Sequence, residues 1–261
     1  MTKILFALLL SVSSYCYAGI PVLMYHQVTN DKPAGDTTIS PEKFAEQMKF
    51  LHDNGYKTIS LDELVDYMNN DILLSEDKTV VLTFDDGWKS ALDNAVPVLD
   101  KYDMKADFNI IAEMLVNSSP EYASKDDLSK LLKNDNFEIE SHSVTHPEDI
   151  GNNLQSWDEG KTQGRSDIDV LNEIVVSKYL LNQITDIHYF VWPAGWSNNH
   201  LIQMVKQTGY KGSLLAWGED DNNTLGGDPY RITRIDISGQ CSLDQFKERL
   251  EKGTDAIKCG K

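Results

Sequence analysis

The chain has 261 residues, of which 41% are hydrophobic and 25% are charged, so its composition is that of a folded globular protein rather than a disordered one. Its 24 basic and 41 acidic residues give a formal net charge of −17, which excludes electrostatic binding to nucleic acid or to an anionic membrane as the basis of its function. Because no Pro-rich or Gly-rich linker divides the chain, we expect a single domain.

The chain begins with the order of segments that is typical of a secretory signal peptide. Lys3 precedes an apolar run over residues 4–10, and small and polar residues follow as far as Ala18. The apolar run is well short of the roughly 20 residues that a membrane-spanning helix needs. We therefore predict a signal peptide over residues 1–18, cleavage after Ala18, and export of residues 19–261 to the periplasm or out of the cell. An uncleaved anchor is the alternative interpretation.

Short apolar runs then alternate with amphipathic stretches along the chain, and we interpret them as strands and helices. The predicted strands are residues 20–25, 80–84, 106–111, 137–140 and 189–191. The predicted helices are residues 41–54, 61–69, 90–102, 125–133, 167–183 and 200–208. Ser60 and Glu63 form a capping-box pattern, and Ser40 precedes Pro41, so both helix starts are well marked.

This alternation implies an α/β fold in which parallel strands are covered by helices. It fits either an open doubly wound sheet or a closed β/α barrel. The polar, glycine-containing stretch over residues 147–165 has no clear period, and we predict a long surface loop there. Such a loop either helps to bind a substrate or is a solvated connection.

The cysteines favour a disulfide near the C-terminus. Cleavage after Ala18 would remove Cys16 and leave Cys241 and Cys259 as an even pair in an oxidising compartment. Two unpaired thiols are the alternative, because the sequence does not show whether the two Cα atoms come close enough for a bond.

The strongest chemical feature lies where the predicted strand 80–84 ends, at Asp85 and Asp86, followed by Gly87. Adjacent side chains on an extended segment point in opposite directions, so one carboxylate can bind a cation while the other faces a reacting water. An isolated Asp-Asp-Gly sequence is also typical of a solvated surface turn, so the interpretation depends on what accompanies it.

A histidine pair accompanies it, because the predicted strand 137–140 leads into His142 and His146. Three residues separate the two imidazoles, a spacing that lets both bind one ion, although either histidine alone is more often an ordinary polar residue. One aspartate and two histidines supply three ligands, the usual number for a catalytic metal that keeps positions open for water and substrate. This ligand set favours Zn²⁺, with Co²⁺, Ni²⁺, Fe²⁺ or Mn²⁺ as alternatives.

Two more predicted strands end in distinctive residues, His26 after strand 20–25 and residues 193–195 after strand 189–191. In a β/α barrel the C-terminal ends of the strands share one face. His26, Asp85, Asp86, His142 and residues 193–195 would then converge. Taken singly, His26 is an ordinary strand-end histidine and Trp192 an ordinary core residue.

The segments TFDDG and HSVTHP, at this separation, resemble the polysaccharide deacetylases of the NodB-homology type. VLMYHQV, SKYLLNQITDIHYFVWPAG and PYRITRIDI resemble the branch of that family that includes poly-β-1,6-N-acetylglucosamine N-deacetylases. The resemblance covers most of residues 19–261. It implies a distorted β/α barrel and a metal-dependent hydrolase that removes N-acetyl groups from an amino-sugar polysaccharide, such as poly-N-acetylglucosamine, a chitin-like polymer or a peptidoglycan glycan.

The resemblance also implies roles for individual residues. Asp85 would be the general base that takes a proton from a metal-activated water, and His26 the general acid. The implied metal ligands are Asp86, His142 and His146. We expect the backbone N–H of Ala194 to bind the oxyanion, and we assign Tyr25, Trp192 and Pro193 to substrate binding.

The sequence departs from the family pattern just before Pro193, where many members carry an arginine that orients the catalytic aspartate. Phe190, Val191 and Trp192 occupy that stretch here. We expect Arg234 to replace the missing arginine, with Arg231 as the competing candidate; both would otherwise be surface arginines.

Other functions remain open from the sequence. An O-acetyl polysaccharide esterase would use the same residues, and the missing arginine also fits a catalytically weak barrel that only binds glycan. A glycosidase is the weakest alternative, because it leaves the two histidines without a role. We expect a monomer with an N-acetylated glycan as its partner and no membrane span.

Overall fold

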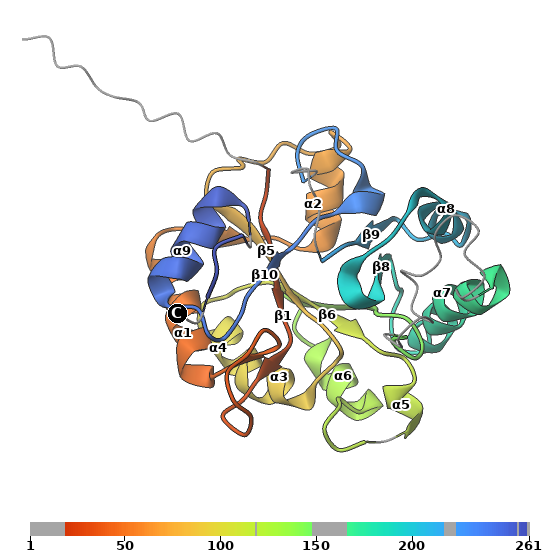
Figure 1. Cartoon of the computed structure of the whole chain (residues 1–261), viewed down its shortest axis with the longest axis horizontal. Helices are drawn as coiled ribbons and strands as arrows, with labels where there is room; N and C mark the ends of the chain where they lie inside the picture. The colour runs from red at the N-terminus through yellow and green to blue at the C-terminus, as the bar shows by residue number, and fades with distance from the viewer. Residues whose placement is uncertain (1–18, 118, 148–165, 217–222, 255, 260–261) are drawn as a thin grey trace, which may run out of the picture.

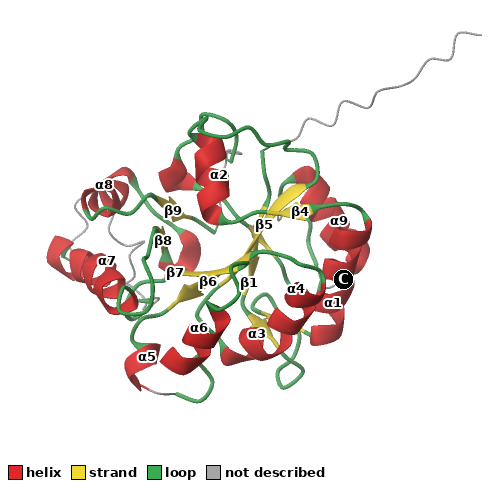
Figure 2. Cartoon of the chain, turned by 180° about the vertical axis from the view of Figure 1, so that it is seen from behind, coloured by secondary structure: helices red, strands yellow, loops and turns green. Residues whose placement is uncertain are grey.

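A computed structural model describes residues 19–117, 119–147, 166–216, 223–254 and 256–259. The predicted signal peptide and, apart from Pro147, the predicted loop over residues 147–165 lie outside these ranges. The strands lie at the centre of the molecule, and the helices surround them (Figure 1). The view from behind shows the same arrangement (Figure 2).

One sheet of eight strands organises the chain. Its strands are β1 (Val22–Tyr25), β4 (Lys57–Thr58), β5 (Thr79–Phe84), β6 (Ala106–Ile110), β7 (Phe137–Ser141), β8 (Tyr189–Val191), β9 (Gly212–Leu214) and β10 (Ile235–Asp236). All its strand pairs are parallel, in the order β10-β1-β5-β6-β7-β8-β9, and β4 pairs with the start of β5. A separate pair, β2 (Gln27–Val28) and β3 (Thr38–Ile39), follows β1.

The two outer strands of this sheet are brought together by the chain that leads into β10. Leu214 forms a parallel bridge with Ile232, and the Leu215 N–H donates to the Ile232 carbonyl at 2.8 Å. Because β10 pairs with β1 at the other edge, the sheet curls into a distorted β/α barrel. The fold that the family resemblance implied is therefore confirmed, and the open-sheet alternative is not.

The predicted helices agree with the structure within two residues, with one exception. The helices of the structure are α1 (Pro41–Asp53), α2 (Leu61–Met68), α3 (Lys89–Asn94), α4 (Val96–Lys101), α5 (Met114–Asn117), α6 (Lys125–Leu131), α7 (Asp167–Leu181), α8 (Asn199–Gln207) and α9 (Leu243–Lys252). Two of them, α5 and α9, were not predicted. The predicted helix over residues 90–102 is two helices, α3 and α4, because Pro97 lacks the N–H that a continuous helix would use. Within the described ranges, no helix is both long and apolar enough to cross a bilayer.

Apolar residues fill both faces of the sheet, which is why the central strands read as continuous hydrophobic runs. Leu23 and Leu82 belong to a cluster that packs beneath the surrounding helices. Their neighbours Val22 and Val81 belong to a second cluster, which includes Leu64 of α2. Because successive side chains in a strand point to opposite faces, the second cluster fills the barrel interior.

Cys241 and Cys259 form a disulfide across 18 residues. Cys241 lies just before α9, so the bond holds the C-terminal segment against the start of that helix. The disulfide predicted from the even cysteine count is confirmed.

Candidate active site

A pocket of about 230 Å³ opens at the C-terminal ends of β1, β5, β7 and β8. It gathers side chains that are up to 212 residues apart in the sequence, from Met24 to Asp236. The predicted site residues that line it are His26, Asp85, Asp86, His142, His146, Trp192, Ala194 and Arg234. This is the face at which β/α barrels carry their active sites.

Asp85 is an ionised carboxylate inside the barrel. It is 2% exposed, and its Oδ1 accepts hydrogen bonds from the Arg234 guanidinium and from the Asn109 amide, both at 2.7 Å. Burial by itself would raise the pKa of Asp85, but the Arg234 charge, with His142 and His26 nearby, holds that pKa well below its usual range. Asp85 therefore remains able to accept a proton at neutral pH.

Asp86 turns its side chain in a different direction from Asp85. Its φ of 71° lies in the left-handed region, and so does that of Gly87, where an added Cβ would lie 3.1 Å from the Ile110 side chain. The Asp86 Oδ2 accepts a hydrogen bond from the Trp88 indole at 2.8 Å. The other oxygen, Oδ1, lies 3.5 Å from the His142 Nε2 and 3.7 Å from the His146 Nε2.

His142 presents a lone pair toward Asp86. Its Nδ1 lies 2.9 Å from the Val191 carbonyl, which can only accept, so Nδ1 carries the proton and Nε2 does not. Burial, and secondarily the charge of His146, lower the pKa of His142 to about 4. A neutral imidazole with its Nε2 free of hydrogen is the form that binds a metal ion.

The loop that carries His146 is fastened to α7 by a buried carboxylate. Glu173 accepts the backbone N–H groups of Val144 and Thr145, both at 2.9 Å, and the Thr145 hydroxyl at 2.7 Å. The His146 N–H donates to the Ser143 hydroxyl at 3.0 Å, and His146 itself adopts a left-handed φ of 49°. Glu173 therefore holds the backbone immediately before His146.

These residues fit a divalent cation. The ligand atoms of Asp86, His142 and His146 all lie within 4.8 Å of one another. Two ligands at about 2.0–2.1 Å from a tetrahedral zinc ion are roughly 3.3 Å apart, close to the nitrogen–oxygen separations at Asp86. The neutral Nε2 of His142 and the carboxylate oxygen also match the chemistry that zinc prefers.

The remaining predicted residues form the walls of the pocket. His26 follows β1, and its buried Nδ1 has no hydrogen-bond partner in the part of the chain that the structure describes. The same holds for the buried indole nitrogen of Trp192, whose side chain is fully enclosed. Ala194 has a left-handed φ of 53°, and Gly195 passes so close to Ala216 that an added Cβ would overlap its side chain.

Tyr25 and Pro193, which we assigned to substrate binding, do not line the pocket. Tyr25 is 1% exposed, its hydroxyl donates to Gln47 at 2.8 Å, and its ring packs against Phe44 and Phe84 in the core beneath the helices. Tyr25 directly precedes His26 in the chain, so its side chain points to the opposite face of the strand, away from the barrel interior. Pro193 is buried and does not line the pocket.

Arg231 is not the partner of Asp85. Its guanidinium donates to Asn199 and lies 3.7 Å from Asp228. Arg234, with a side chain that is 1% exposed, occupies the position beside Asp85 that we expected one of the two arginines to take.

Three residues that the sequence did not single out support the pocket. Asn109 interrupts the apolar run of β6, and this interruption was the one available signal. Trp88 binds Asp86, and Glu173 holds the histidine loop, but neither contact follows from spacing or composition.

Known proteins share both the sequence pattern and the fold. The profile of the polysaccharide deacetylase family matches residues 74–213. YxkH of Bacillus subtilis (strain 168), a protein assigned to the polysaccharide deacetylases, is 31% identical over 90% of this chain and 77% of its own. A poly-β-1,6-N-acetyl-D-glucosamine N-deacetylase of Staphylococcus epidermidis is 24% identical over 87% of this chain and 81% of its own.

Two solved structures have the same fold. The Streptococcus pyogenes deacetylase PplD, solved in complex with acetate, superposes with a TM-score of 0.73 over 88% of this chain and 97% of its own, at 25% identity. IcaB from Ammonifex degensii superposes with a TM-score of 0.72 over 92% of this chain and 98% of its own, at 21% identity.

Proposed function

Because this chain belongs to the polysaccharide deacetylase family, we propose that it is a metal-dependent enzyme that removes N-acetyl groups from a polymer of N-acetylglucosamine. The observation that carries the proposal is a buried, ionised Asp85 beside a cluster of Asp86, His142 and His146 that fits a divalent cation. The likeness to a poly-β-1,6-N-acetyl-D-glucosamine N-deacetylase supports the choice of polymer.

Asp86, His142 and His146 would hold the ion, with Zn²⁺ as our first choice. When bound there, such an ion polarises a carbonyl and lowers the pKa of a water molecule. Asp85 accepts the proton of the attacking water, because Arg234 and Asn109 fix its carboxylate in the ionised form. The water oxygen then forms a bond to the acetyl carbon.

The reaction also needs a proton donor for the leaving amine and a donor for the oxyanion. His26 lines the same pocket and can return a proton to the nitrogen as the C–N bond breaks. The backbone N–H of Ala194 is our candidate for the oxyanion contact, because Ala194 lines the same pocket. The products are acetate and a free amine on the sugar.

The position of Arg234 also bears on the competing functions. A barrel that only binds glycan was suggested by the missing arginine before Pro193. Arg234, which directly precedes β10, places its guanidinium 2.7 Å from Asp85 and so replaces the missing arginine. This contact supports turnover rather than binding alone. An O-acetyl esterase would use the same groups, so only substrate comparison separates it from the deacetylase.

The deciding experiment measures acetate release from β-1,6-linked and β-1,4-linked N-acetylglucosamine oligomers and from an O-acetylated xylan. The protein is first treated with a chelator and then given Zn²⁺, Co²⁺ or Ni²⁺. We expect metal-restored release from the amino-sugar oligomers. Release from the xylan alone would replace the proposal with an esterase, and no release from any substrate by metal-loaded protein would overturn it.

Two substitutions test the division of labour within the pocket. Asp85→Asn should keep the metal and lose about 10²–10⁴ in kcat, because it removes the base and leaves the ligands intact. His142→Ala should lose both metal and turnover. Metal content by mass spectrometry and kcat on the active oligomer measure the two effects. His200→Ala, which alters an exposed imidazole beside Asp167, is the control and should change neither; full activity in Asp85→Asn or His142→Ala contradicts the assignment.

A further inference from the structure

Arg249 is a buried cation to which the proposed reaction assigns no role. It lies on α9 and is 6% exposed. Its Nε and Nη2 both donate to the Ile257 carbonyl, at 3.0 and 2.6 Å, and its Nη1 donates to the Asp236 carbonyl in β10. Buried polar groups are normally hydrogen-bonded, and here one guanidinium binds main-chain carbonyls of two separate segments. Arg249 therefore ties the C-terminal segment, residues 256–259, to β10.

β10 carries groups that belong to the active-site pocket. Asp236 lines the pocket, and Arg234, two residues earlier, donates to Asp85 at 2.7 Å. β10 is two residues long and lies at one end of the strand order, where it pairs with β1. An end strand this short has few ladder hydrogen bonds, so its position depends on contacts from outside the sheet. Arg249 supplies such a contact.

The disulfide fixes the other end of this connection. Cys259 lies two residues after Ile257 and is bonded to Cys241, which is 2% exposed. The last residues of a chain are usually poorly ordered unless something holds them. Because the bond holds Cys259, it keeps the Ile257 carbonyl within reach of Arg249.

Cys241 ends a turn, residues 238–241, that is itself anchored. The Lys43 Nζ donates to the Gly239 carbonyl at 2.6 Å and to the Cys241 carbonyl at 3.2 Å. Gly239 packs so closely on β3 that an added Cβ would lie 2.1 Å from the Thr38 carbonyl oxygen. The disulfide therefore bonds the C-terminal segment to a fixed point of the fold.

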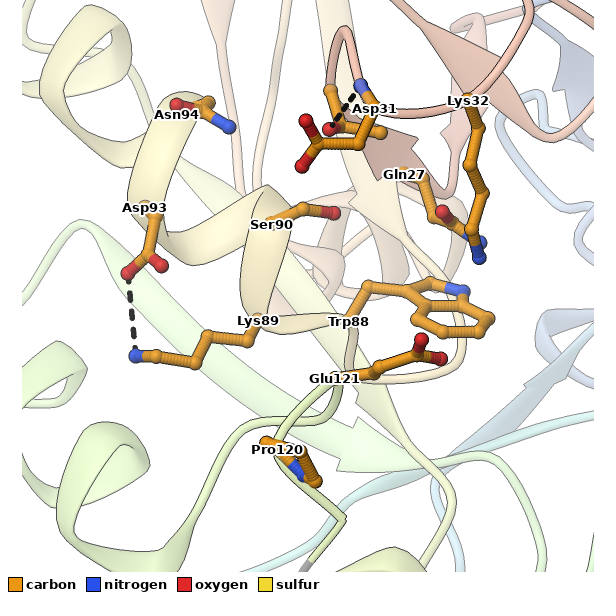
Figure 3. A pocket seen from close by; sticks show the side chains of 11 residues that line it. Gln27, Asp31, Lys32, Trp88, Lys89, Ser90, Asp93, Asn94, Pro120 and Glu121 are labelled. Carbon is orange, nitrogen blue, oxygen red and sulfur yellow. Dashed lines mark hydrogen bonds and ion pairs between the residues drawn. The ribbon is translucent and has the colours of Figure 1, made fainter.

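The proposed metal ligands lie outside this connection. Asp86 follows β5, and the Trp88 indole N–H donates to its carboxylate at 2.8 Å. In Figure 3 the loop after β2 reaches this tryptophan through Lys32, whose Nζ lies 4.8 Å from the centre of the ring. His142 and His146 follow β7, so none of these residues comes from β10 or α9. Loosening β10 should therefore alter turnover and leave the affinity for Zn²⁺ nearly unchanged.

We propose that Arg249 is a positioning residue for the deacetylation and that it acts through the Cys241–Cys259 disulfide. The inference rests on the proposed function, because Arg249 acts by holding β10 and thereby the Arg234 guanidinium beside Asp85. A misplacement of about 1 Å at a reacting group can cost about 10²-fold in rate. The enzyme then reaches full turnover only when the disulfide has formed.

The first test measures kcat and KM for acetate release by Arg249→Met, on the amino-sugar oligomer that the enzyme accepts, together with its Kd for Zn²⁺. We expect kcat to fall about 10–10²-fold, while KM and the Kd change by less than about twofold. Arg249→Lys keeps the charge but not the planar fork that reaches both carbonyls, so its kcat should lie between the two. Lys252→Met alters an exposed cation of the same helix, paired with Glu248, and should change nothing.

A second variant removes the bond and leaves Arg249 in place. Cys241→Ser combined with Cys259→Ser should lower kcat about tenfold, again with little change in the Kd for Zn²⁺. Because the bond acts through Arg249, the same two changes should cost nothing further in Arg249→Met. If Arg249→Met does not fold, the serine variant decides. Unchanged kcat in the serine variant, or a loss of Zn²⁺ affinity that parallels the loss of kcat, would overturn the inference.

Hydrogen–deuterium exchange separates this inference from the proposed function, because it needs no turnover. Peptides that cover β10 should exchange faster in Arg249→Met and in the serine variant than in the unmodified protein, while peptides of β6 and β7 should not change. Faster exchange at β10 supports the role of Arg249 in holding this strand even if no acetate is released from any oligomer. Unchanged exchange at β10 in both variants overturns the inference and leaves the deacetylase intact.

Discussion

Two buried aspartates on neighbouring strands of the barrel have opposite protonation behaviour. Asp85 follows β5 and is 2% exposed; Asp107 lies in β6 and is fully buried. Burial raises the pKa of both carboxyls, but Arg234 lies 2.7 Å from Asp85, whereas Asp107 is in register with another acid, Glu138 of β7. The pKa of Asp85 is therefore lowered, and burial together with Glu138 holds the pKa of Asp107 well above its usual range.

The comparison extends to a third buried carboxyl, Glu140 of β7. At the C-terminal ends of the strands, Asp85 and Asp86 each have a dedicated donor, Arg234 and Trp88. In β7, burial also raises the pKa of Glu140, which accepts the backbone N–H groups of His188 and Tyr189. A cation beside a buried carboxyl favours its ionised form, whereas burial without a cation raises its pKa.

Removing the cation should make Asp85 behave like Asp107, and this is the largest effect that we expect. Arg234→Met leaves Asp85 buried without its counter-charge, so its pKa rises and the acidic limb of the kcat/KM profile moves to higher pH. We predict a loss of about 10²–10⁴ in kcat at pH 7. The pH profile distinguishes this from simple misfolding. Arg231→Met, at an arginine paired with Asp228, is the control, and a profile that does not shift would contradict the role of Arg234.

Removing the donor at Asp86 should have a smaller effect, confined to the metal. Trp88→Phe keeps an aromatic ring and deletes the N–H that fixes the Asp86 carboxylate. Loss of such a supporting contact typically weakens metal binding about 10–100-fold. Competition with a fluorescent chelator measures the Kd for Zn²⁺. Trp196→Phe, at a tryptophan that does not line the active-site pocket, should leave the Kd unchanged; unchanged affinity in Trp88→Phe would show that the contact does not matter.

Neutralising Asp107 should have the smallest effect, on stability rather than activity. The pKa of Asp107 is higher in the folded than in the unfolded protein, so above about pH 4 the folded state binds more protons at this carboxyl. The stability that Asp107 contributes is therefore lost as pH rises through its folded-state pKa. Asp107→Asn should therefore reduce the fall in unfolding free energy between pH 5 and pH 8 by about 1 kcal/mol or more.

Urea unfolding at the two pH values measures this difference, with Asp126→Asn, an exposed acid at the start of α6, as the control. An unchanged dependence on pH would show that Asp107 is ionised in the folded protein. For Asp85 the sign is opposite, because its lowered pKa contributes stability that is present above about pH 4 and lost as pH falls.

Several features could be predicted from the sequence because they depend on neighbouring residues. Serine caps at Ser40 and Ser60 mark helix starts, and both are hydrogen-bonded as expected. The aspartate pair after an apolar run and the histidine pair after another predicted two strand ends with metal-binding potential, and these residues meet in one pocket. The error at residues 90–102 was also local, since Pro97 was visible within the predicted helix.

Local sequence by itself predicted the central strands, most of the helices and the polar strand ends, and the two cysteines that follow residue 18 favoured a disulfide between them. Only the tertiary structure decided that Arg234 rather than Arg231 reaches Asp85, that Glu173 holds the His146 loop, and that Tyr25 is a core residue. The physical reason is that these contacts join residues from separate strands and helices. Their formation depends on the curl of the sheet and on which face each side chain takes, neither of which leaves a periodic signal in the chain.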